Sequence, residues 1–513
     1  MKTIALASVL VALAGTAGAS EVFVTPDDDL GSLLFGAESG SVFVLGPGEY
    51  VVETTSLIAP NFTIRSTDGP EATVITLADE ERLLFAGSEA GVLVFEGITL
   101  RGIHSTPSRA SGLVAYESDD VRIVATDCRF EGPGWGFSLA ERSDVTFKNC
   151  SFDGFTDLAA VNLFGSAQAV FDGCVFRNFD GSGRSVSLSD STNASFDQCL
   201  FEDNTTDDSG AAIFFEGEPE TRGSLTVSRS VFRRNTSDQG GAIDVSSATV
   251  RILDSVFEAN TVGGTANGAA ILASVGDRAL SVQDSVFIDN RGNSDTLALA
   301  GAFVSFTNNV VVQRGPDAPD VAMFIGAGLG REVVVSHNTI VGPGAFGADA
   351  RGTAIGGAPT LVSNNVVRGF SEPFFDDILF TAGLAIEFNN IEGFDASGTN
   401  IDADPLFADV AALDFRLSPG SPSIDAGSPD LSGRDALDRD GDLNTFEPIP
   451  VDSDGAPRRA SIGGTITNPD QGAFEFAQTV ATPCTPADLV EPFGVVDLSD
   501  VDAFVASFLA ACP

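Results

Sequence analysis

A repeated slip in the alternation of apolar and polar residues restricts most strongly how this chain can fold. Val145 and Phe147 alternate with polar residues, as in a half-buried strand, and the next apolar pair is Cys150 and Phe152. A shift of one residue turns the apolar side chains to the opposite face of a strand, so we expect the chain to turn a corner here. The same slip recurs at 225–232, 250–257 and 280–287.

The first residue after each corner belongs to a column that runs through most of the chain. By subtraction of residue numbers, neighbouring members are 22 to 31 residues apart, a period typical of solenoids, propellers and arrays. Each unit holds two short strands and no helical period, which favours a parallel β-solenoid of about 12 coils. The members of the column are Ile98, Cys128, Cys150, Cys174, Cys199, Ser230, Ser255, Ser285, Asn309, Asn338, Asn365 and Ile391.

Four consecutive members of the column are the cysteines at 128, 150, 174 and 199. Four cysteines in a secreted chain suggest two disulfides. However, stacked side chains of in-register coils point the same way, whereas a disulfide needs Cβ atoms that face each other. We therefore predict a ladder of buried free thiols, with disulfides between neighbouring coils as the alternative.

The asparagines near the corners are interpreted as structural. Asn309, Asn338 and Asn365 can hydrogen-bond from coil to coil inside a core. Asparagine also tolerates left-handed backbone, so we expect a second asparagine column to form corners. We expect His337, which lies at a corner, to be exposed to solvent. The second column consists of Asn204, Asn235, Asn260 and Asn290.

The N-terminus and the composition both indicate export. Residues 1–19 read as a signal peptide, with Lys2, an apolar run at 4–14 and small residues at 17–19. This run is too short to span a bilayer and no later stretch of about 20 apolar residues follows, so we expect a secreted, extracellular or cell-surface protein without a membrane span. The formal charge of −45 makes nucleic acid a poor partner and attracts divalent cations.

Two sets of motifs resemble known β-helix proteins. Val-Leu-Gly-Pro-Gly-Glu-Tyr at 44–50, followed by Thr-Ile-Arg-Ser at 63–66 and Thr-Val-Ile at 73–75, resembles the first coils of right-handed parallel β-helix proteins of the pectate-lyase-like superfamily. The Phe-x-x-Asn…Gly-Gly-Ala-Ile type of repeat at 201–213, 232–243 and 257–271 resembles bacterial surface β-helix proteins of the adhesin-like and polymorphic outer-membrane types. The resemblance implies an all-β, right-handed parallel β-helix, with an N-terminal cap and first coils at 20–95 and repeats at 96–395.

The same superfamily contains pectate and alginate lyases, epimerases and polygalacturonase-like hydrolases. A lyase needs a base beside the sugar C5 atom and a group that neutralises the uronate. The candidates in this chain are His104, Arg109 and Tyr116, although a polar surface loop explains them equally well. The hydrolase motifs are absent, and the adjacent aspartates at 119–120 and 207–208 point to opposite faces of a strand, so neither pair forms an acid/base couple by itself.

After the last repeat, residues 396–478 resemble the segment that closes many secreted bacterial β-helices. The shared motifs are Asp-Pro-Leu-Phe at 404–407, Gly-Ser-Pro-Ser-Ile-Asp-Ala-Gly at 420–427 and Asp-Gln-Gly-Ala-Phe-Glu-Phe at 470–476. We interpret 396–478 as the C-terminal cap with closing coils. Within it, Asp438, Asp440, Asp442 and Asn444 place oxygen ligands at alternate positions, which suits Ca²⁺; a solvated acidic turn is the alternative.

The tail, residues 479–513, is predicted to be a small α-helical module. Asp497 can cap a helix whose apolar residues follow i, i+3, i+4 spacing. Cys484 and Cys512 bracket this helix, and we expect them to form a disulfide because a unit of this size needs a covalent link.

Residues 487–508 of this tail resemble one dockerin repeat, of the Cys-flanked kind found at the ends of exported bacterial proteins. Asp488, Asp497 and Asp500 match the first and the last two acidic ligands of the dockerin calcium loop. The middle ligands are missing and the loop is one residue longer. The resemblance implies attachment or sorting through an anchoring partner.

These observations lead to two hypotheses on function. The first is a secreted or cell-surface β-helix with a structural, adhesive or glycan-binding role, whose partner is a polysaccharide or a cell-surface component. The alternative is a polysaccharide lyase, epimerase or glycoside hydrolase that acts on acidic polysaccharide. Calcium is the one cofactor that the residues suggest. Arginine, histidine and carboxylates converging beside one sheet favour the enzyme, whereas a uniformly acidic rod favours the first hypothesis.

Overall fold

The computed structural model describes most of the chain between residues 21 and 476. The described ranges are 21–35, 37–53, 61–78, 83–85, 91–102, 112–116, 121–132, 135–139, 142–156, 159–263, 267–292, 294–315, 321–347, 352–374, 383–394, 398–435, 437–439, 442–444, 447–459, 461–462 and 465–476, with the backbone alone at 83–85, 112–116, 135, 327–331, 461–462 and 465–466. The predicted signal peptide and the predicted helix and disulfide of the tail lie outside these residues and stay predictions.

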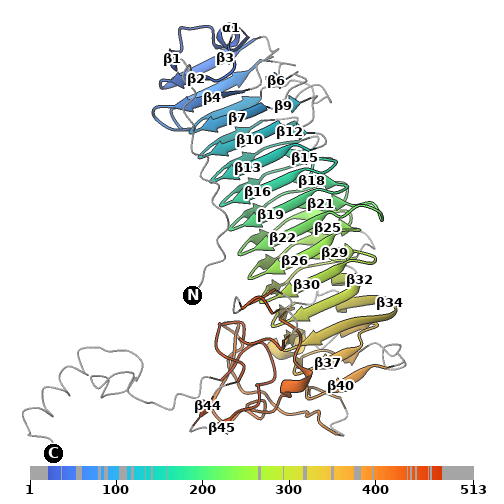
Figure 1. The fold of residues 1–513 in the computed structure, drawn as a ribbon. Coiled ribbons are helices and arrows are strands. Elements are labelled where there is room, and N and C mark those ends of the chain that lie inside the picture. The colour runs from blue at the N-terminus through green and yellow to red at the C-terminus, as the bar shows by residue number, and fades with distance from the viewer. Residues whose placement is uncertain are drawn as a thin grey trace, which may run out of the picture.

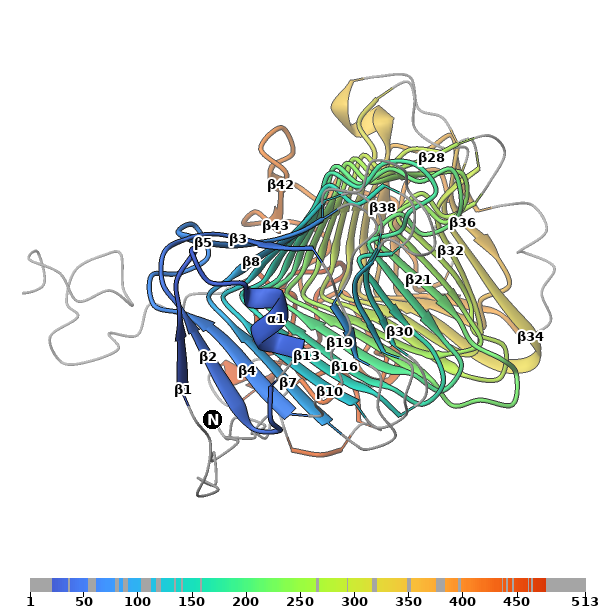
Figure 2. The same cartoon turned by 90° about the horizontal axis from the view of Figure 1, so that it is seen from above.

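Parallel strands in three stacks form the wall of an elongated solenoid, and each coil passes from stack III to stack I to stack II (Figures 1 and 2). Strands β32 (Asp295–Thr307) and β34 (Val321–Ser336) are long enough to belong to both stack III and stack I. The other strands of stack I are β1 (Glu21–Val24), β2 (Ser41–Leu45), β4 (Asn61–Ser66), β7 (Gly91–Glu96), β10 (Val121–Thr126), β13 (Asp144–Lys148), β16 (Gln168–Asp172), β19 (Asn193–Asp197), β22 (Ser224–Ser228), β26 (Thr249–Leu253), β30 (Ala279–Gln283), β37 (Leu361–Ser363) and β40 (Ala385–Glu387).

Stacks II and III complete the wall. Stack II consists of β3 (Gly48–Val52), β5 (Thr73–Leu77), β8 (Thr99–Gly102), β11 (Arg129–Glu131), β14 (Ser151–Asp153), β17 (Val175–Arg177), β20 (Leu200–Glu202), β23 (Val231–Arg233), β27 (Val256–Glu258), β31 (Val286–Ile288), β33 (Val310–Val312), β35 (Thr339–Val341), β38 (Val366–Arg368) and β41 (Asn390–Ile391). The further strands of stack III are β6 (Leu83–Phe85), β9 (Gly112–Tyr116), β12 (Trp135–Leu139), β15 (Val161–Leu163), β18 (Val186–Ser189), β21 (Ile213–Glu216), β25 (Ile243–Ser246), β29 (Ile271–Ser274), β36 (Thr353–Gly357) and β39 (Glu372–Phe374).

Short elements lie outside the stacks. Helix α1 (Leu30–Phe35) lies at the N-terminal end of the solenoid, where Leu30 and Leu34 are buried in the core and Asp29 caps the helix by accepting a hydrogen bond from Ser32 N (Figure 1). The remaining elements are β24 (Thr236–Ser237), β28 (Thr261–Val262), β42 (Phe407–Asp409), β43 (Asp414–Leu417), β44 (Ser461–Ile462), β45 (Thr465–Ile466) and the 3₁₀ helices η1 (Pro343–Phe346) and η3 (Pro429–Leu431). No helix among the described residues has the length and apolar character needed to cross a membrane.

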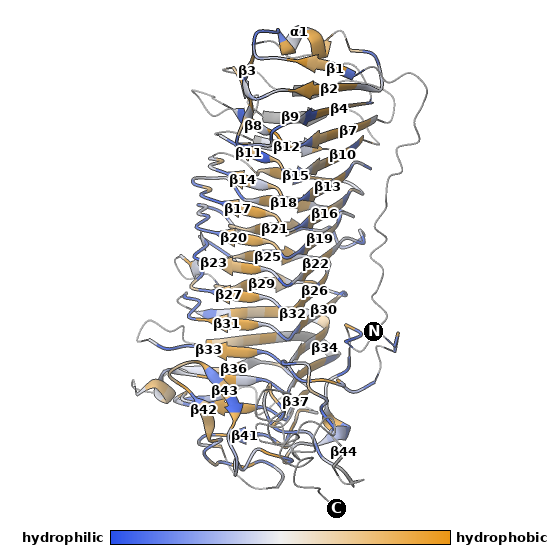
Figure 3. Cartoon of the chain, turned by 90° about the vertical axis from the view of Figure 1, so that its left-hand side faces the viewer, coloured by the Kyte–Doolittle hydropathy of each residue, from blue (hydrophilic) through white to orange (hydrophobic). Residues whose placement is uncertain are grey.

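The coils stack in register, so equivalent side chains pile up along the axis. Phe152 pairs with Phe176 and Phe176 with Phe201, and the ring centroids of both pairs are 4.6 Å apart. In β13 and β16 the inward residues are buried and most of the outward ones are polar. Figure 3 shows apolar residues concentrated in the strands. Stacked aromatic pairs contribute about 0.5–1.5 kcal/mol beyond the burial of their apolar area. The predicted solenoid with its internal phenylalanine column is confirmed.

One residue with left-handed backbone turns the chain from stack I to stack II in each of the last twelve coils. From β8 to β41, the last 12 strands of stack II each begin one residue after a column position, which confirms about 12 coils. The residue before each column position has φ between 49° and 64°. These corner residues, called the corner ridge below, are Gly97, Asp127, Asn149, Gly173, Gln198, Arg229, Asp254, Asp284, Asn308, His337, Asn364 and Phe388.

The asparagine ladder in the column is confirmed, with one corrected member. Asn309 Nδ2 donates to Asn338 Oδ1 (3.2 Å), and Asn338 Nδ2 donates to Asn365 Oδ1 (3.0 Å). The next member is Asn389 and not the predicted Ile391, because Asn390 pairs with Val366 and Asn365 Nδ2 donates to Asn389 Oδ1 (2.9 Å). The prediction failed here because Asn389 and Ile391 both fit the alternation of apolar and polar residues after the corner.

The second asparagine column is a ladder too, but its asparagines are not the left-handed residues. Asn204, Asn235 and Asn260 each donate to the asparagine of the next coil at 2.8–2.9 Å, and all are buried. The positive φ angles belong to the preceding residues, Asp203, Arg234, Ala259 and Asp289. The expectation that these asparagines form corners is therefore wrong. The side chain of each asparagine hydrogen-bonds to the asparagine of a neighbouring coil, and the residue before it has the left-handed backbone that makes the turn.

The cysteine column is a ladder of buried free thiols, as predicted, and the alternative of disulfides is not realised. Cys128, Cys150, Cys174 and Cys199 are at most 2% exposed. Burial raises the pKa of the Cys128 thiol well above its usual value, and its contact with Cys150 acts in the same direction. Thiols that are both buried and protonated are poor nucleophiles.

The chemical reactivity of these four thiols tests the ladder. Under native conditions, iodoacetamide should leave Cys128, Cys150, Cys174 and Cys199 unmodified, and in denaturant it should modify all four without prior reduction, as measured by peptide mass spectrometry. A disulfide-linked peptide pair among these four cysteines would contradict the ladder.

The asparagine ladder predicts a stability effect. Replacing Asn338 by alanine removes the acceptor of Asn309 N and of one N–H of Asn309 Nδ2; the other N–H of Nδ2 keeps its bond to Val282 O. The buried Asn309 N is then left without the acceptor that it has in the ladder. We expect a loss of about 2 kcal/mol or more in the free energy of unfolding, measured by urea denaturation followed by circular dichroism. The control is Gln168→Ala on the exposed face of β16, which should change stability by less than about 0.5 kcal/mol. Equal effects of both substitutions would argue against the ladder.

Candidate functional site

A row of outward side chains on stack III passes through the candidate site. Ser187, Phe214, Asp244 and Leu272 occupy the same register position on β18, β21, β25 and β29. Their neighbours in sequence, such as Ile213 and Ile243, are fully buried, so these four side chains point out of the solenoid. The connections from stack II to stack III run beside this row and carry further polar residues.

Arg184 lies in one of these connections and links the next one, which carries Asp208 and Ser209, to the outward row at Phe214. Its guanidinium carbon lies 3.8 Å from the centre of the Phe214 ring, a cation–π contact. Its Nε donates to the carbonyl oxygen of Ser209 (2.8 Å), and its Nη2 forms an ion pair with Asp208. The Arg184 side chain is 19% exposed and that of Asp208 is 56% exposed. The guanidinium is therefore held rigidly, while the Asp208 carboxylate stays open to a ligand.

Asp244 lies next to this pair. Burial raises the pKa of its carboxyl group to about 6, and the negative charges of Asp208 and Glu216 add to the rise, whereas a hydrogen bond with Ser209 and the charge of Arg184 oppose it. A carboxyl group that titrates near pH 6 can donate a proton as well as accept a hydrogen bond. Together, Arg184, Asp208, Phe214 and Asp244 are called the stack III cluster.

Of the three predicted catalytic residues, only Tyr116 can be compared with the position of this cluster, and only by its backbone. His104 and Arg109 lie outside the described residues. Tyr116 ends β9, of which the backbone alone is described, and β9 is four coil steps from β21 along stack III, about 19 Å at the spacing of parallel strands. The candidates at 104, 109 and 116 therefore stay a prediction.

Sequence reasoning missed the cluster because its members are far apart in the chain. The pair at 207–208 was expected to form no acid/base couple by itself, and Asp208 indeed has its nearest ionic partner, Arg184, in the preceding coil. The usable signal was the register: Gly-Ala-Ala-Ile at 210–213 and Gly-Gly-Ala-Ile at 240–243 align, which places Phe214 beside Asp244.

Two of the predicted calcium ligands, Asp438 and Asp442, accept hydrogen bonds from backbone N–H groups, and the side chain of Asn444 donates to Glu447. Asp438 Oδ1 accepts a hydrogen bond from Leu443 N (3.0 Å), and Asp442 Oδ1 accepts one from Asn444 N (2.7 Å). Asp440 lies outside the described residues, as do Asp488, Asp497 and Asp500. Among the residues that the structure does describe, no group of three or more His, Cys, Asp or Glu side chains suits a metal ion. Calcium binding at either place stays a prediction.

The C-terminal segment, residues 428–476, lies against the corner ridge of the last coils, beside stacks I and II (Figure 1). Arg458 is buried and donates to Asn308 Oδ1 (2.8 Å), to Ala473 O (3.0 Å) and to Glu475 (2.7 Å). Arg439 forms ion pairs with Asp254 (3.0 Å) and Asp284 (2.9 Å). These contacts hold the segment to coils that precede it by up to 185 residues.

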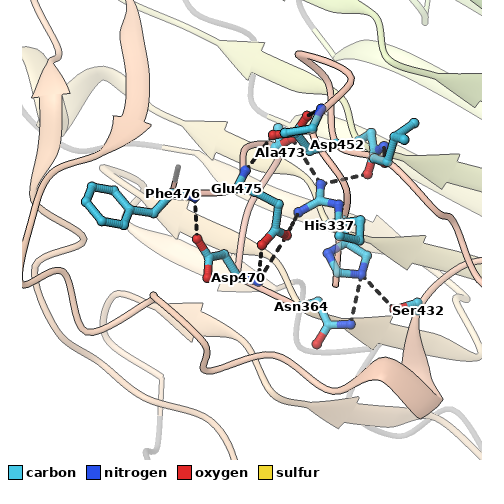
Figure 4. A network of polar contacts seen from close by, with 12 residues as sticks. His337, Asn364, Ser432, Asp452, Asp470, Ala473, Glu475 and Phe476 are labelled. Atoms are coloured by element: carbon cyan, nitrogen blue, oxygen red, sulfur yellow. Dashed lines mark hydrogen bonds and ion pairs between the residues drawn. The ribbon is translucent and has the colours of Figure 1, made fainter. Parts of the chain in front are cut away.

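His337 lies inside this network and not in solvent, which corrects the prediction (Figure 4). Its Nε2 is 3.1 Å from the amide nitrogen of Asn364 and 2.9 Å from Ser432 Oγ. Burial lowers the pKa of His337 well below its usual value, and the charge of Arg458 adds to this effect. The prediction failed because a corner is exposed unless a segment distant in sequence covers it, as the C-terminal segment does here. His337 is therefore neutral and has a structural role.

Comparisons with known proteins give one family match and several similar solved structures. A family described as right handed beta helix region matches residues 84–252. None of the curated proteins matches the chain. Among solved structures, the chain is similar to a PL6 family polysaccharide lyase from Pseudopedobacter saltans, with 13% identity, a TM-score of 0.40 and coverage of 75% of this chain and 94% of the lyase.

Two further structures show weaker similarity. One is the A-module of a mannuronan C-5 epimerase from Azotobacter vinelandii, with 13% identity, a TM-score of 0.30 and coverage of 67% of this chain and 91% of the module. The other is a pectate lyase, with 13% identity, a TM-score of 0.28 and coverage of 89% and 97%. These values are too low to say anything about a shared activity. The strand pairing defines the molecule as a parallel β-solenoid, and the right-handed β-helix family matches residues 84–252 of it.

The titration of Asp244 tests the electrostatics of the cluster. Because its folded pKa of about 6 exceeds the usual 3.8, its stabilising contribution is complete below about pH 3.8 and is lost as the pH rises through about 6. Carbon-13 NMR of labelled aspartate should show a resonance that titrates near pH 6, is absent in Asp244→Asn and moves to higher pH in Arg184→Ala. A midpoint near 4 would contradict this description of the site.

Proposed function

We propose that this protein is an exported β-helix that binds polysaccharide at the stack III cluster. The observation that carries the proposal is the combination of Phe214, covered by the Arg184 guanidinium, with the open carboxylate of Asp208 and the half-buried carboxyl of Asp244. An aromatic ring and a planar guanidinium form a platform for the apolar face of a sugar ring, and carboxylates accept hydrogen bonds from its hydroxyl groups.

The charge of the cluster indicates which sugars it prefers. Asp208, Asp244 and Glu216 outnumber Arg184, and the guanidinium already forms an ion pair with Asp208. A uronate carboxylate would be repelled here, whereas neutral hydroxyl groups are good partners. The ligand of this cluster is therefore a neutral polysaccharide segment that runs across several coils, and the partner molecule is a polysaccharide or another glycan of a cell surface.

Location and attachment form part of the same proposal. The apolar stretch at 1–19 supports export, and the dockerin-like tail at 479–513 supports attachment or sorting through an anchoring partner. In this arrangement the solenoid presents the stack III cluster outside the cell, with a structural or adhesive role.

A second candidate function is glycoside hydrolysis, because Asp244 has the property expected of a general acid. A carboxyl group with a pKa near 6 beside a second acidic residue, here Asp208 paired with Arg184, is the arrangement by which two acidic residues divide the acid and base roles at a glycosidic bond. Asp244 would protonate the leaving oxygen, and Asp208 would act as the second carboxylate.

A binding and product assay tests both functions. The exported chain is assayed by affinity electrophoresis against a panel of neutral and uronate polysaccharides, with reducing ends measured in parallel. We expect retardation by a neutral polymer, weakened at least tenfold in Arg184→Ala and Phe214→Ala. The control Arg177→Ala, which removes an ion-paired arginine from stack II, should behave like the parent protein.

The outcomes separate the candidates. New reducing ends that disappear in Asp244→Asn would establish hydrolysis, and binding without new ends would establish the non-catalytic role. Unsaturated products, or binding that is unaffected by both cluster variants, would contradict the proposal.

A further inference from the structure

A groove of about 330 Å³ lies on the outer face of stack I, where β26, β30, β32 and β34 pass beneath the C-terminal segment. Its wall depends on that segment: Gly433 N donates to Ser336 Oγ (2.8 Å) and the backbone of Arg434 pairs with that of Pro448. The groove is on a different face from the stack III cluster. Its volume is at the small end of the range of about 300–1,000 Å³ that is typical of ligand sites.

Four side chains cross the floor of the groove in one register row. Arg251 pairs with Ser281, Ser281 with Ser305, and Ser305 with Val334, each one strand further along the axis. Neighbouring members of the row are therefore about 4.8 Å apart. The row presents a cation, two hydroxyl groups and an apolar end in that order.

The polar groups of this row are available to a ligand. Within the described part of the chain, Arg251 has no ion-pair partner, and the hydroxyl groups of Ser281 and Ser305 have no hydrogen-bond partner. Most other described arginines near the coils are ion-paired with a carboxylate of an adjacent coil, as Arg101 is with Glu131 and Arg229 with Asp197. Arg251 is thus a cation that the solenoid itself does not use.

The second wall of the groove consists of an exposed phenylalanine ring and an ion pair without net charge. Phe303 is 57% exposed beside the floor. The carboxylate of Glu332, next to Phe303 in register, is 3.1 Å from the guanidinium of Arg434 in an ion pair. Because this pair neutralises Glu332, the charge that a ligand meets in the groove is that of Arg251.

We propose that this groove binds a uronic acid unit, with its carboxylate at Arg251. The pyranose ring lies over Ser281 and Ser305, which hydrogen-bond its hydroxyl groups, and its apolar face contacts Phe303. A guanidinium recognises a carboxylate through two parallel hydrogen bonds, and the hydroxyl row distinguishes a sugar from a simple organic anion. This site does not depend on the stack III cluster, which has the opposite charge.

Ligand-observed NMR titrations of the full exported chain test the site with four probes: glucuronate, glucuronate methyl ester, glucose and acetate. We expect glucuronate to bind at least tenfold more tightly than the other three. Arg251→Gln should weaken glucuronate binding at least tenfold, and Ser305→Val should weaken it without a change of charge. Arg184→Ala, in the stack III cluster, should leave it unchanged.

A matched control tests whether the loss of any outward positive charge on stack I weakens glucuronate binding. Arg122→Gln removes another outward arginine of stack I, on β10, five coil steps from β26, and should leave binding unchanged. The proposal is overturned if glucuronate does not bind, if acetate or glucose binds as tightly, or if Arg122→Gln weakens binding as much as Arg251→Gln. Loss of glucuronate binding in Arg184→Ala would move the site to the stack III cluster and would also overturn it.

Discussion

The in-register stacking of coils is the constraint on which the whole structure depends. A single residue with left-handed backbone turns each of the last twelve coils from stack I to stack II, and ten of these twelve corner residues are not glycine. Left-handed backbone costs roughly 1–2 kcal/mol for an ordinary residue. The ladders that follow each corner offset this cost, because the side chain of one coil satisfies the backbone and side chain of the next, as Asn338 Oδ1 does for Asn309. A slip of one residue in the register would turn these side chains to the other face of the wall and break the bonds between them.

The C-terminal segment changes the energetics of a solenoid. In a simple repeat protein each coil contacts only its neighbours, so that stability is a sum of local terms. Here Arg439 reaches Asp254 and Asp284, and residues near it reach Asn308, His337 and Asn364, so one segment connects five consecutive corners. The segment therefore couples the unfolding of coils that do not touch one another, and it also forms one wall of the groove beside Arg251.

The repeat of the fold could be predicted from the sequence because its physical cause is local. The slip in alternation at each corner, and the column of Cys, Ser and Asn behind it, led to the solenoid, the free thiols and the first asparagine ladder. The errors arose where two local patterns fit equally well, as for Ile391 and Asn389, or where a distant segment covers a corner, as for His337. The site was not predicted because Arg184, Asp208 and Asp244 meet only through stacking, whereas the predicted residues were chosen for their chemistry within one loop.

The positions of the four column sulfur atoms test the account most directly. Anomalous scattering from sulfur at long wavelength, measured on crystals of the exported chain, locates these atoms without reference to the rest of the structure. The account predicts that Cys128, Cys150, Cys174 and Cys199 lie on one line inside the solenoid, about 4.8 Å apart from coil to coil. Sulfur atoms that are bonded in pairs, or scattered through the molecule, would contradict in-register stacking of the coils.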